Sequence, residues 1–158
     1  MGRARVFPFR LLLRLDIGLL LFRAAGFLLA FTFGVQKIGW YVTAFHAGKP
    51  LLSSIGLTPL IAHMGLPLPV ILALWITLNE SIGAFFVGIG LLTRFAAASL
   101  ALGMIGALYT SVRLEEDWLR AALYFVIFLG LIFTGAGKFS IDRLLQTRKT
   151  KQHRASVF

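Results

Sequence analysis

The chain alternates between long apolar blocks and short polar stretches, and the apolar blocks are long enough to cross a membrane. A helix needs about 20 mostly apolar residues to span a hydrocarbon core of about 30 Å. Four blocks approach or reach this length, and we expect membrane spans at about residues 15–36, 69–92, 95–112 and 118–137. The pattern therefore predicts an all-α, polytopic membrane protein built on a four-helix transmembrane bundle over residues 15–137.

The connection between the first two spans, residues 37–66, is long but not polar. Four of its residues fall on one helical face, which is typical of a segment lying at the membrane interface. These are Trp40, Tyr41, Ala44 and Phe45. Further on, Thr58 as N-cap and Pro59 as first helical residue predict a short helix that Gly65 ends. We therefore expect an interfacial helical segment between the first two spans, lying over the bundle as a lid.

Charge is distributed unevenly between the two sides of this bundle, with a net charge of +10. One side carries the basic arm 1–14, the turn after the second span and the basic tail 138–158. Its basic residues are Arg3, Arg5, Arg10, Arg14, Arg94, Lys138, Arg143, Arg148, Lys149, Lys151 and Arg154. The other side has Lys37, Lys49, Arg113, Arg120 and an acidic loop, Glu115–Asp117, which we expect to be solvated.

Cytoplasmic loops of membrane proteins carry the excess of Lys and Arg. The charge distribution therefore predicts a multi-pass protein of the plasma (inner) membrane with both termini cytoplasmic. It also explains the basic composition without nucleic acid binding. Anionic lipids are the expected partners of the two basic termini.

The chain has no cysteine. This excludes disulfides, thiol redox relays, cysteine-ligated iron–sulfur clusters and covalently attached c-type haem. A haem held by two histidines on facing helices is disfavoured, because His46, His63 and His153 all lie outside the predicted spans. No metal site and no intrinsic cofactor are expected, whereas a quinone held without a covalent bond stays open.

Two charged residues lie inside the predicted spans. Glu80 is close to the middle of the second span and Arg23 lies in the first. Ionisable residues at such depth are rare and mark functional or partner sites by default. An extended Arg23 side chain reaches far enough to suggest a contact with Glu80, which would lower the penalty that each charge meets alone. Asn79, Gln36 and Thr32 are candidates to complete this polar cluster.

Two interpretations of the cluster stay open. The first is a site that binds a polar ring such as a quinone head and moves a proton through Glu80. The second is a structural clasp between two helices.

The order of several short motifs resembles the DoxX family of small bacterial and archaeal membrane proteins. The motifs are R-L-x-x-G-L-L-L at Arg14–Leu21, Asn79-Glu80, G-L-L-T-R at Gly90–Arg94 and G-x-G-K-F-S-I-D-R-L-L at Gly135–Leu145. The resemblance implies a four-helix bundle with cytoplasmic ends and a link to quinone redox chemistry. Founding members are membrane subunits of a thiosulfate:quinone oxidoreductase, and others are linked to oxidative-stress complexes. Glu80 and Arg94 match family positions, and Lys138 and Asp142 in the last motif are candidates for a structural or topological role.

The main functional prediction is an accessory membrane subunit of a quinone-linked oxidoreductase or oxidative-stress complex, not a stand-alone enzyme. Glu80 is the candidate proton carrier, and a redox partner subunit would supply the electrons. Two alternatives come from other classes of protein. One is a small-solute transporter or carrier, and the other is a non-catalytic scaffold whose basic tail docks a partner or lipid. The sequence leaves the oligomeric state open, including a homo-oligomer.

Overall fold

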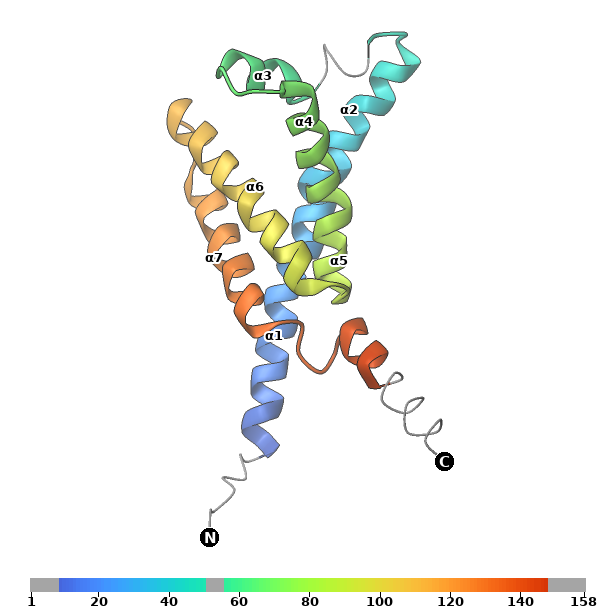
Figure 1. Cartoon of the computed structure of the whole chain (residues 1–158), viewed down its shortest axis with the longest axis vertical. Helices are drawn as coiled ribbons and strands as arrows, with labels where there is room; N and C mark the ends of the chain where they lie inside the picture. Colours follow the sequence, from blue (N-terminus) through green and yellow to red (C-terminus); the bar gives the residue numbers. More distant parts are fainter. Residues whose placement is uncertain (1–8, 51–55, 148–158) are drawn as a thin grey trace.

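A computed structural model describes residues 9–50 and 56–147, all of whose regular structure is helical. Residues 1–8, 51–55 and 148–158 lie outside the described part, and with them most of the predicted basic arm and half of the predicted tail. The elements are α1 (Phe9–Leu29), η1 (Ala30–Gly34), α2 (Val35–His46), α3 (Thr58–His63), α4 (Pro69–Leu78), η2 (Asn79–Gly83), α5 (Ala84–Ile89), α6 (Thr93–Arg113) and α7 (Leu119–Thr134). Residues 141–147 form one more helical segment (Figure 1).

The first span is longer than predicted. Helices α1 and α2 run on through the π-helical turn η1 as one rod (Figure 1). Residues 37–46 therefore continue the first rod and do not form the separate segment expected at the start of the connection 37–66. Gly34 and Gly39 have the lowest helix propensity in residues 30–46, and the helix accommodates Gly34 inside the π-helical turn. The short helix α3 forms as expected, although Thr58 is its first residue rather than its N-cap.

Within the described residues, three helical stretches are long and apolar enough to cross a membrane: Leu15–His46, Pro69–Ile89 and Thr93–Arg113. The fourth, Leu119–Thr134, is apolar but has 16 residues, or about 24 Å at 1.5 Å per residue. It is shorter than the predicted span 118–137 because Gly135 takes a φ of 76°, which ends the helix. The result confirms an all-helical bundle of membrane-type helices.

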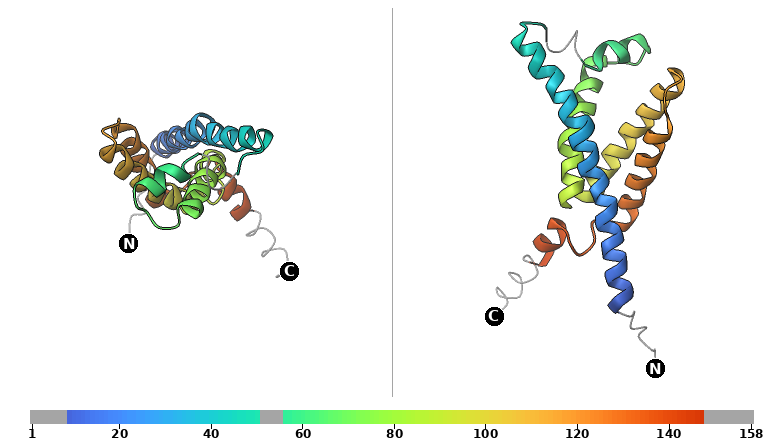
Figure 2. Two further views of the ribbon diagram at one scale, coloured as in Figure 1. Left: turned by 90° about the horizontal axis from the view of Figure 1, so that it is seen from above. Right: turned by 180° about the vertical axis from the view of Figure 1, so that it is seen from behind.

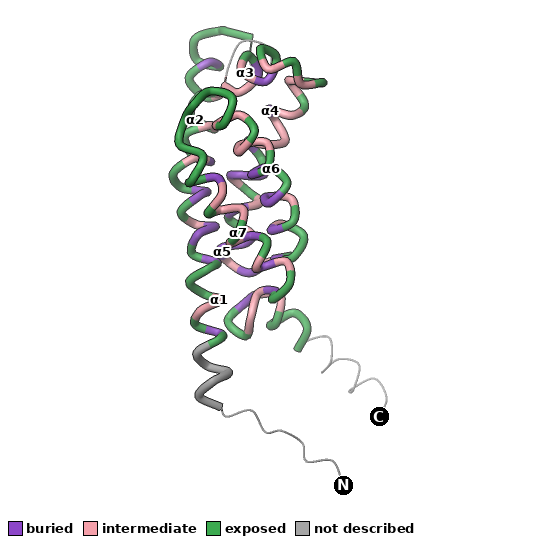
Figure 3. The backbone as a smooth tube through the Cα atoms, turned by 90° about the vertical axis from the view of Figure 1, so that its left-hand side faces the viewer, coloured by how far each residue is buried: buried purple, intermediate pink, exposed green. Residues whose placement is uncertain are grey.

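The helices pack around a shared buried centre (Figure 3). α6 lies along α7, while α1 lies along α5 and η1 against η2. Leu100, Val87, Phe128 and Leu131 are fully covered in the core. Large apolar side chains also cover the outside, with Phe95 84% and Phe133 75% exposed. Such an apolar exterior is the surface expected against lipid rather than water.

The two ends of the bundle differ. We call one end the base: it holds the start of α1, the α5–α6 turn and residues 135–147 (Figure 2). At the opposite end, which we call the fork, α6 and α7 lean away from α2 and α4, and α3 lies across the tip of α4 (Figures 1 and 2). The first and last described helical segments thus lie at the same end, which is the arrangement of an even number of passes.

Candidate functional site

Two π-helical turns face each other in the middle of the bundle. η1 in the first span packs against η2 in the second. A Cβ atom placed on Gly34 would lie 2.7 Å from the carbonyl oxygen of Glu80 and 2.7 Å from the Cα of Ser81. Only glycine therefore allows this close approach. π-helical turns are rare and occur often at functional sites. The residues that this pair of turns positions are therefore candidates for a functional site.

Glu80, in η2, forms an ion pair with Lys37, one turn beyond η1. The side chains are 8% and 11% exposed, respectively. The sequence analysis placed Lys37 outside the bundle, and this is wrong because the first helix continues past it. A carboxylate and an ammonium group thus meet inside the bundle, where each reduces the penalty of burying the other.

This ion pair lines a cavity of about 200 Å³ in the fork, between the first two spans, α6 and α7. Arg120 and Tyr124 of α7 line it too, and Arg120 lies 5.3 Å from the ring centre of Phe33. Glu116 and Asp117 of the acidic loop are exposed, as expected, and also line this cavity. The cavity thus combines cationic donors, a phenol hydroxyl and carboxylates, a set that can hydrogen-bond carbonyl oxygens and exchange protons.

Arg23 does not contact Glu80, so the predicted pair is wrong. Its guanidinium lies nearer the base and donates hydrogen bonds to four backbone carbonyls. These belong to Val87 at 3.2 Å, Gly88 at 2.8 Å, Ala136 at 3.3 Å and Phe139 at 2.5 Å. The last carbonyls of a helix lack partners within it, and Arg23 donates to two of them at the end of α5; that of Val87 also accepts from the backbone N–H of Gly90 at 3.1 Å. It therefore ties α1 to α5 and to the segment after α7.

The predicted polar cluster around Glu80 is only partly assembled. Asn79 is buried and donates from Nδ2 to the carbonyl of Ser99 at 2.9 Å, which links η2 to α6. Thr32 is exposed and donates to the carbonyl of Leu28 within its own helix. Gln36 is exposed as well. Asn79 thus stays next to the site, whereas Thr32 and Gln36 do not reach it.

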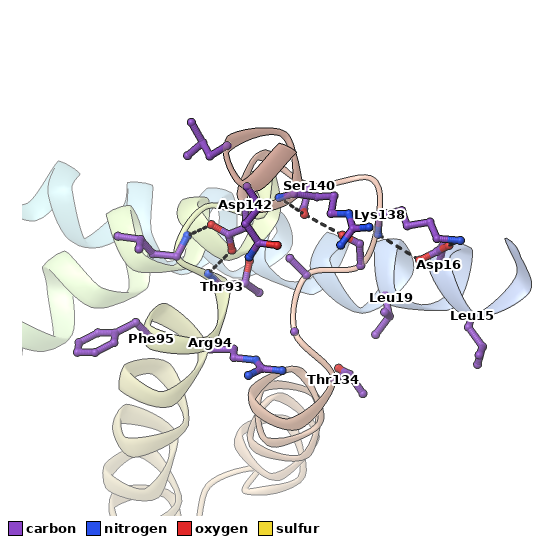
Figure 4. A pocket seen from close by; sticks show the side chains of 17 residues that line it. Leu15, Asp16, Leu19, Thr93, Arg94, Phe95, Thr134, Lys138, Ser140 and Asp142 are labelled. Atoms are coloured by element: carbon purple, nitrogen blue, oxygen red, sulfur yellow. Dashed lines mark hydrogen bonds and ion pairs between the residues drawn. The ribbon is translucent and has the colours of Figure 1, made fainter. Parts of the chain in front are cut away.

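The candidate structural residues Arg94, Lys138 and Asp142 gather at the base (Figure 4). The carboxylate of Asp142 accepts hydrogen bonds from the backbone N–H groups of Leu92 at 2.7 Å and Thr93 at 3.0 Å, at the start of α6. Lys138 pairs with Asp16 of α1, with 3.4 Å between Nζ and Oδ2. Arg94 donates to the carbonyl of Phe133 at 3.4 Å. These contacts fasten residues 133–142 to α1 and α6.

Sequence reasoning missed most of the residues that line the cavity, among them Lys37, Arg120 and Tyr124. A signal for Lys37 was present, because no proline interrupts residues 35–46 and the helix had no reason to stop at Gln36. Arg120 and Tyr124 lie four residues apart on one helix face, which could have indicated a shared polar surface.

The chain gives no match among curated proteins or among solved structures. A family model described as "TQO small subunit DoxD" matches residues 9–158. This match agrees with the DoxX-like motifs and with the membrane-type helices of the fold. Because it covers nearly the whole chain, the protein belongs to the DoxD family of DoxX-like membrane proteins.

Proposed function

We propose that this protein is an accessory membrane subunit of a quinone-linked oxidoreductase, and that the cavity in the fork binds the quinone headgroup. The observation that carries the proposal is the buried Lys37–Glu80 ion pair that faces this cavity. The family description, the small subunit of a larger assembly, supports a role beside a partner. The partner would hold the electron-donating centre, since a chain without cysteine lacks the ligands of most protein-bound redox centres.

The side chains of the cavity fit the chemistry of a quinone. Its ring carries two carbonyl oxygens that accept hydrogen bonds, and Lys37, Arg120 and Tyr124 are donors. Conversion between quinone and quinol moves two electrons and two protons. In our proposal the partner subunit exchanges the two electrons. The Glu80 carboxyl group transfers one proton to or from one ring oxygen, and solvent exchanges the second proton at the other ring oxygen. Lys37 positions the Glu80 side chain at the cavity through their ion pair.

We further propose that the protein lies in the plasma (inner) membrane with its base on the cytoplasmic side. The base cavity carries Arg94, Lys138 and Arg143 against Asp16 and Asp142, whereas the fork cavity carries Lys37 and Arg120 against Glu80, Glu116 and Asp117. This distribution follows the rule that positive charge stays inside. The quinone cavity would then open in the outer half of the membrane.

The test is Glu80→Gln in the complex extracted gently from its own membrane. Turnover is followed as reduction of a short-chain quinone with thiosulfate, the donor of the family's founding members. We expect turnover to fall about 100-fold or more, the range usual for loss of a general acid–base group, while co-isolation of the partner is unchanged. Glu115→Gln is the matched control, because it makes the same chemical change on an exposed residue outside the cavity.

Native mass spectrometry of the unaltered complex provides a second readout. A co-isolated redox subunit or a retained quinone supports the proposal. Unchanged turnover in Glu80→Gln would remove this residue from the mechanism. A bare homo-oligomer that moves solute across sealed liposomes would instead favour the carrier alternative.

A further inference from the structure

A second, larger cavity of about 870 Å³ lies at the base, far from the Glu80 site. It is bordered by the start of α1, the start of α6 and residues 134–146 (Figure 4). The proposed function does not use this cavity. Its walls combine charged groups and exposed apolar side chains, and each set restricts what the cavity can bind.

The cavity has five charged residues, and their pairing leaves an excess of positive charge. Asp16 is engaged by the Lys138 ammonium and its backbone N–H. Asp142 is engaged by two backbone N–H groups at the start of α6. Arg94 and Arg143 line the cavity without a carboxylate within ion-pair distance in the described part of the chain. Three cationic and two acidic side chains leave a net charge of +1, and neither guanidinium forms an ion pair within the described residues.

The rim of the cavity is apolar and faces outward. Leu15 is 57% exposed, Leu92 60% and Phe95 84%. These residues lie at the end of spans α1 and α6, where the apolar exterior of the bundle gives way to charged residues. A ligand there would meet cationic groups and hydrocarbon side by side.

We propose that the base cavity binds an acidic phospholipid, with its phosphate between Arg94 and Arg143 and its acyl chains along Leu92 and Phe95. Guanidinium groups bind phosphate oxygens through paired, charge-assisted hydrogen bonds. The helix start at Thr93 is already occupied by Asp142, so the two arginine side chains carry the recognition. The apolar rim favours a lipid over a free phosphate, because a small soluble anion would leave it uncovered. Lipid bound here would join α6 to the 141–147 helix.

The experiment is native mass spectrometry of the full chain purified in detergent and titrated with phosphatidylglycerol or phosphatidylcholine. One surface arginine contributes about five-fold to the affinity for acidic lipid. We therefore expect phosphatidylglycerol binding to weaken about five-fold in Arg143→Gln and about 25-fold in Arg94→Gln/Arg143→Gln. The matched control is Arg113→Gln at the fork, where the side chain lies over Tyr109. It removes the same charge and should bind as the unaltered chain does.

If the double variant fails to fold, Arg143→Gln alone still tests the proposal. The Arg143 side chain is exposed, so we expect this single variant to fold. Unchanged phosphatidylglycerol binding in this variant would overturn the proposal. Equal weakening in Arg113→Gln, or equal binding of phosphatidylcholine, would overturn it too, since either shows a non-specific surface effect. Displacement of the lipid by millimolar inorganic phosphate would identify a free-phosphate site instead. The basic tail is present in every variant, so any lipid that it binds is the same in each.

Discussion

Replacing Gly34 by alanine tests whether the contact of the two π-helical turns builds the Glu80 site. The new methyl carbon would lie 2.7 Å from the carbonyl oxygen of Glu80 and from the Cα of Ser81, and 3.0 Å from the Ser81 hydroxyl. Non-bonded carbon atoms prefer separations of about 3.5–4.0 Å. Two of the three neighbours are backbone atoms that cannot rotate away. The first two spans must therefore separate by about 1 Å at this level.

The expected loss of stability follows from two opposing effects. Overpacking of this kind costs about 1–3 kcal/mol, while exchanging glycine for alanine inside a helix contributes about 1 kcal/mol. Gly39→Ala in the same rod isolates the second effect, because its Cβ would meet nothing within 4 Å. The two variants should therefore differ by the cost of the clash alone, about 1–3 kcal/mol.

Thermal unfolding in detergent, followed by circular dichroism, measures this difference. We expect Gly34→Ala to melt below Gly39→Ala by at least about 2 °C. Separation of the spans also moves Glu80 relative to Lys37, so quinone-linked turnover should fall in Gly34→Ala and stay unchanged in Gly39→Ala. Equal melting temperatures in the two variants would refute the close packing of η1 on η2.

Three further substitutions test individual contacts. Lys37→Met should destabilise the protein by about 3–5 kcal/mol because it leaves the Glu80 carboxylate buried and unpaired. Adding Glu80→Gln should recover part of this loss, as measured by chemical unfolding. If the effects of the two substitutions on the free energy of unfolding are additive, the pairing is contradicted. Arg23→Lys should lower stability by about 2 kcal/mol or more, since one ammonium cannot reach all four carbonyls and leaves buried acceptors unsatisfied; an unchanged melting temperature would show that these bonds contribute little. Asp142→Ala should lower the free energy of unfolding by about 1–2 kcal/mol, because it removes the cap of α6. Hydrogen exchange of the Thr93 amide should become faster. An amide that stays protected there would exclude the capping role.

The fold class and most of the membrane spans could be predicted from the order of residues. Apolar blocks near 20 residues long have few alternatives to membrane helices. The predicted ends of the spans were less accurate. The first rod continues to His46 because its apolar face continues beyond Gln36, and the last helix stops at Thr134 because Gly135 adopts a positive φ.

Sequence reasoning identified only part of the candidate site. Glu80 stood out because a carboxylate inside an apolar block is rare. Arg23 was predicted to be its partner because an extended Arg23 side chain could reach the depth of Glu80 along the helix axis. That depth says nothing about the direction in which a side chain points. In the structure Arg23 turns to the carbonyls at the end of α5, and Lys37 meets Glu80 instead.

The sequence by itself determined that this is an apolar, helical membrane protein with its basic residues gathered toward one end, and that Glu80 would be buried. Those properties depend on hydrophobic length and on composition, which are local. Only the tertiary structure decided which cation neutralises Glu80 and which cavity the pair faces. Partner choice depends on the rotation and spacing of neighbouring helices, and the approach at Gly34 sets both here.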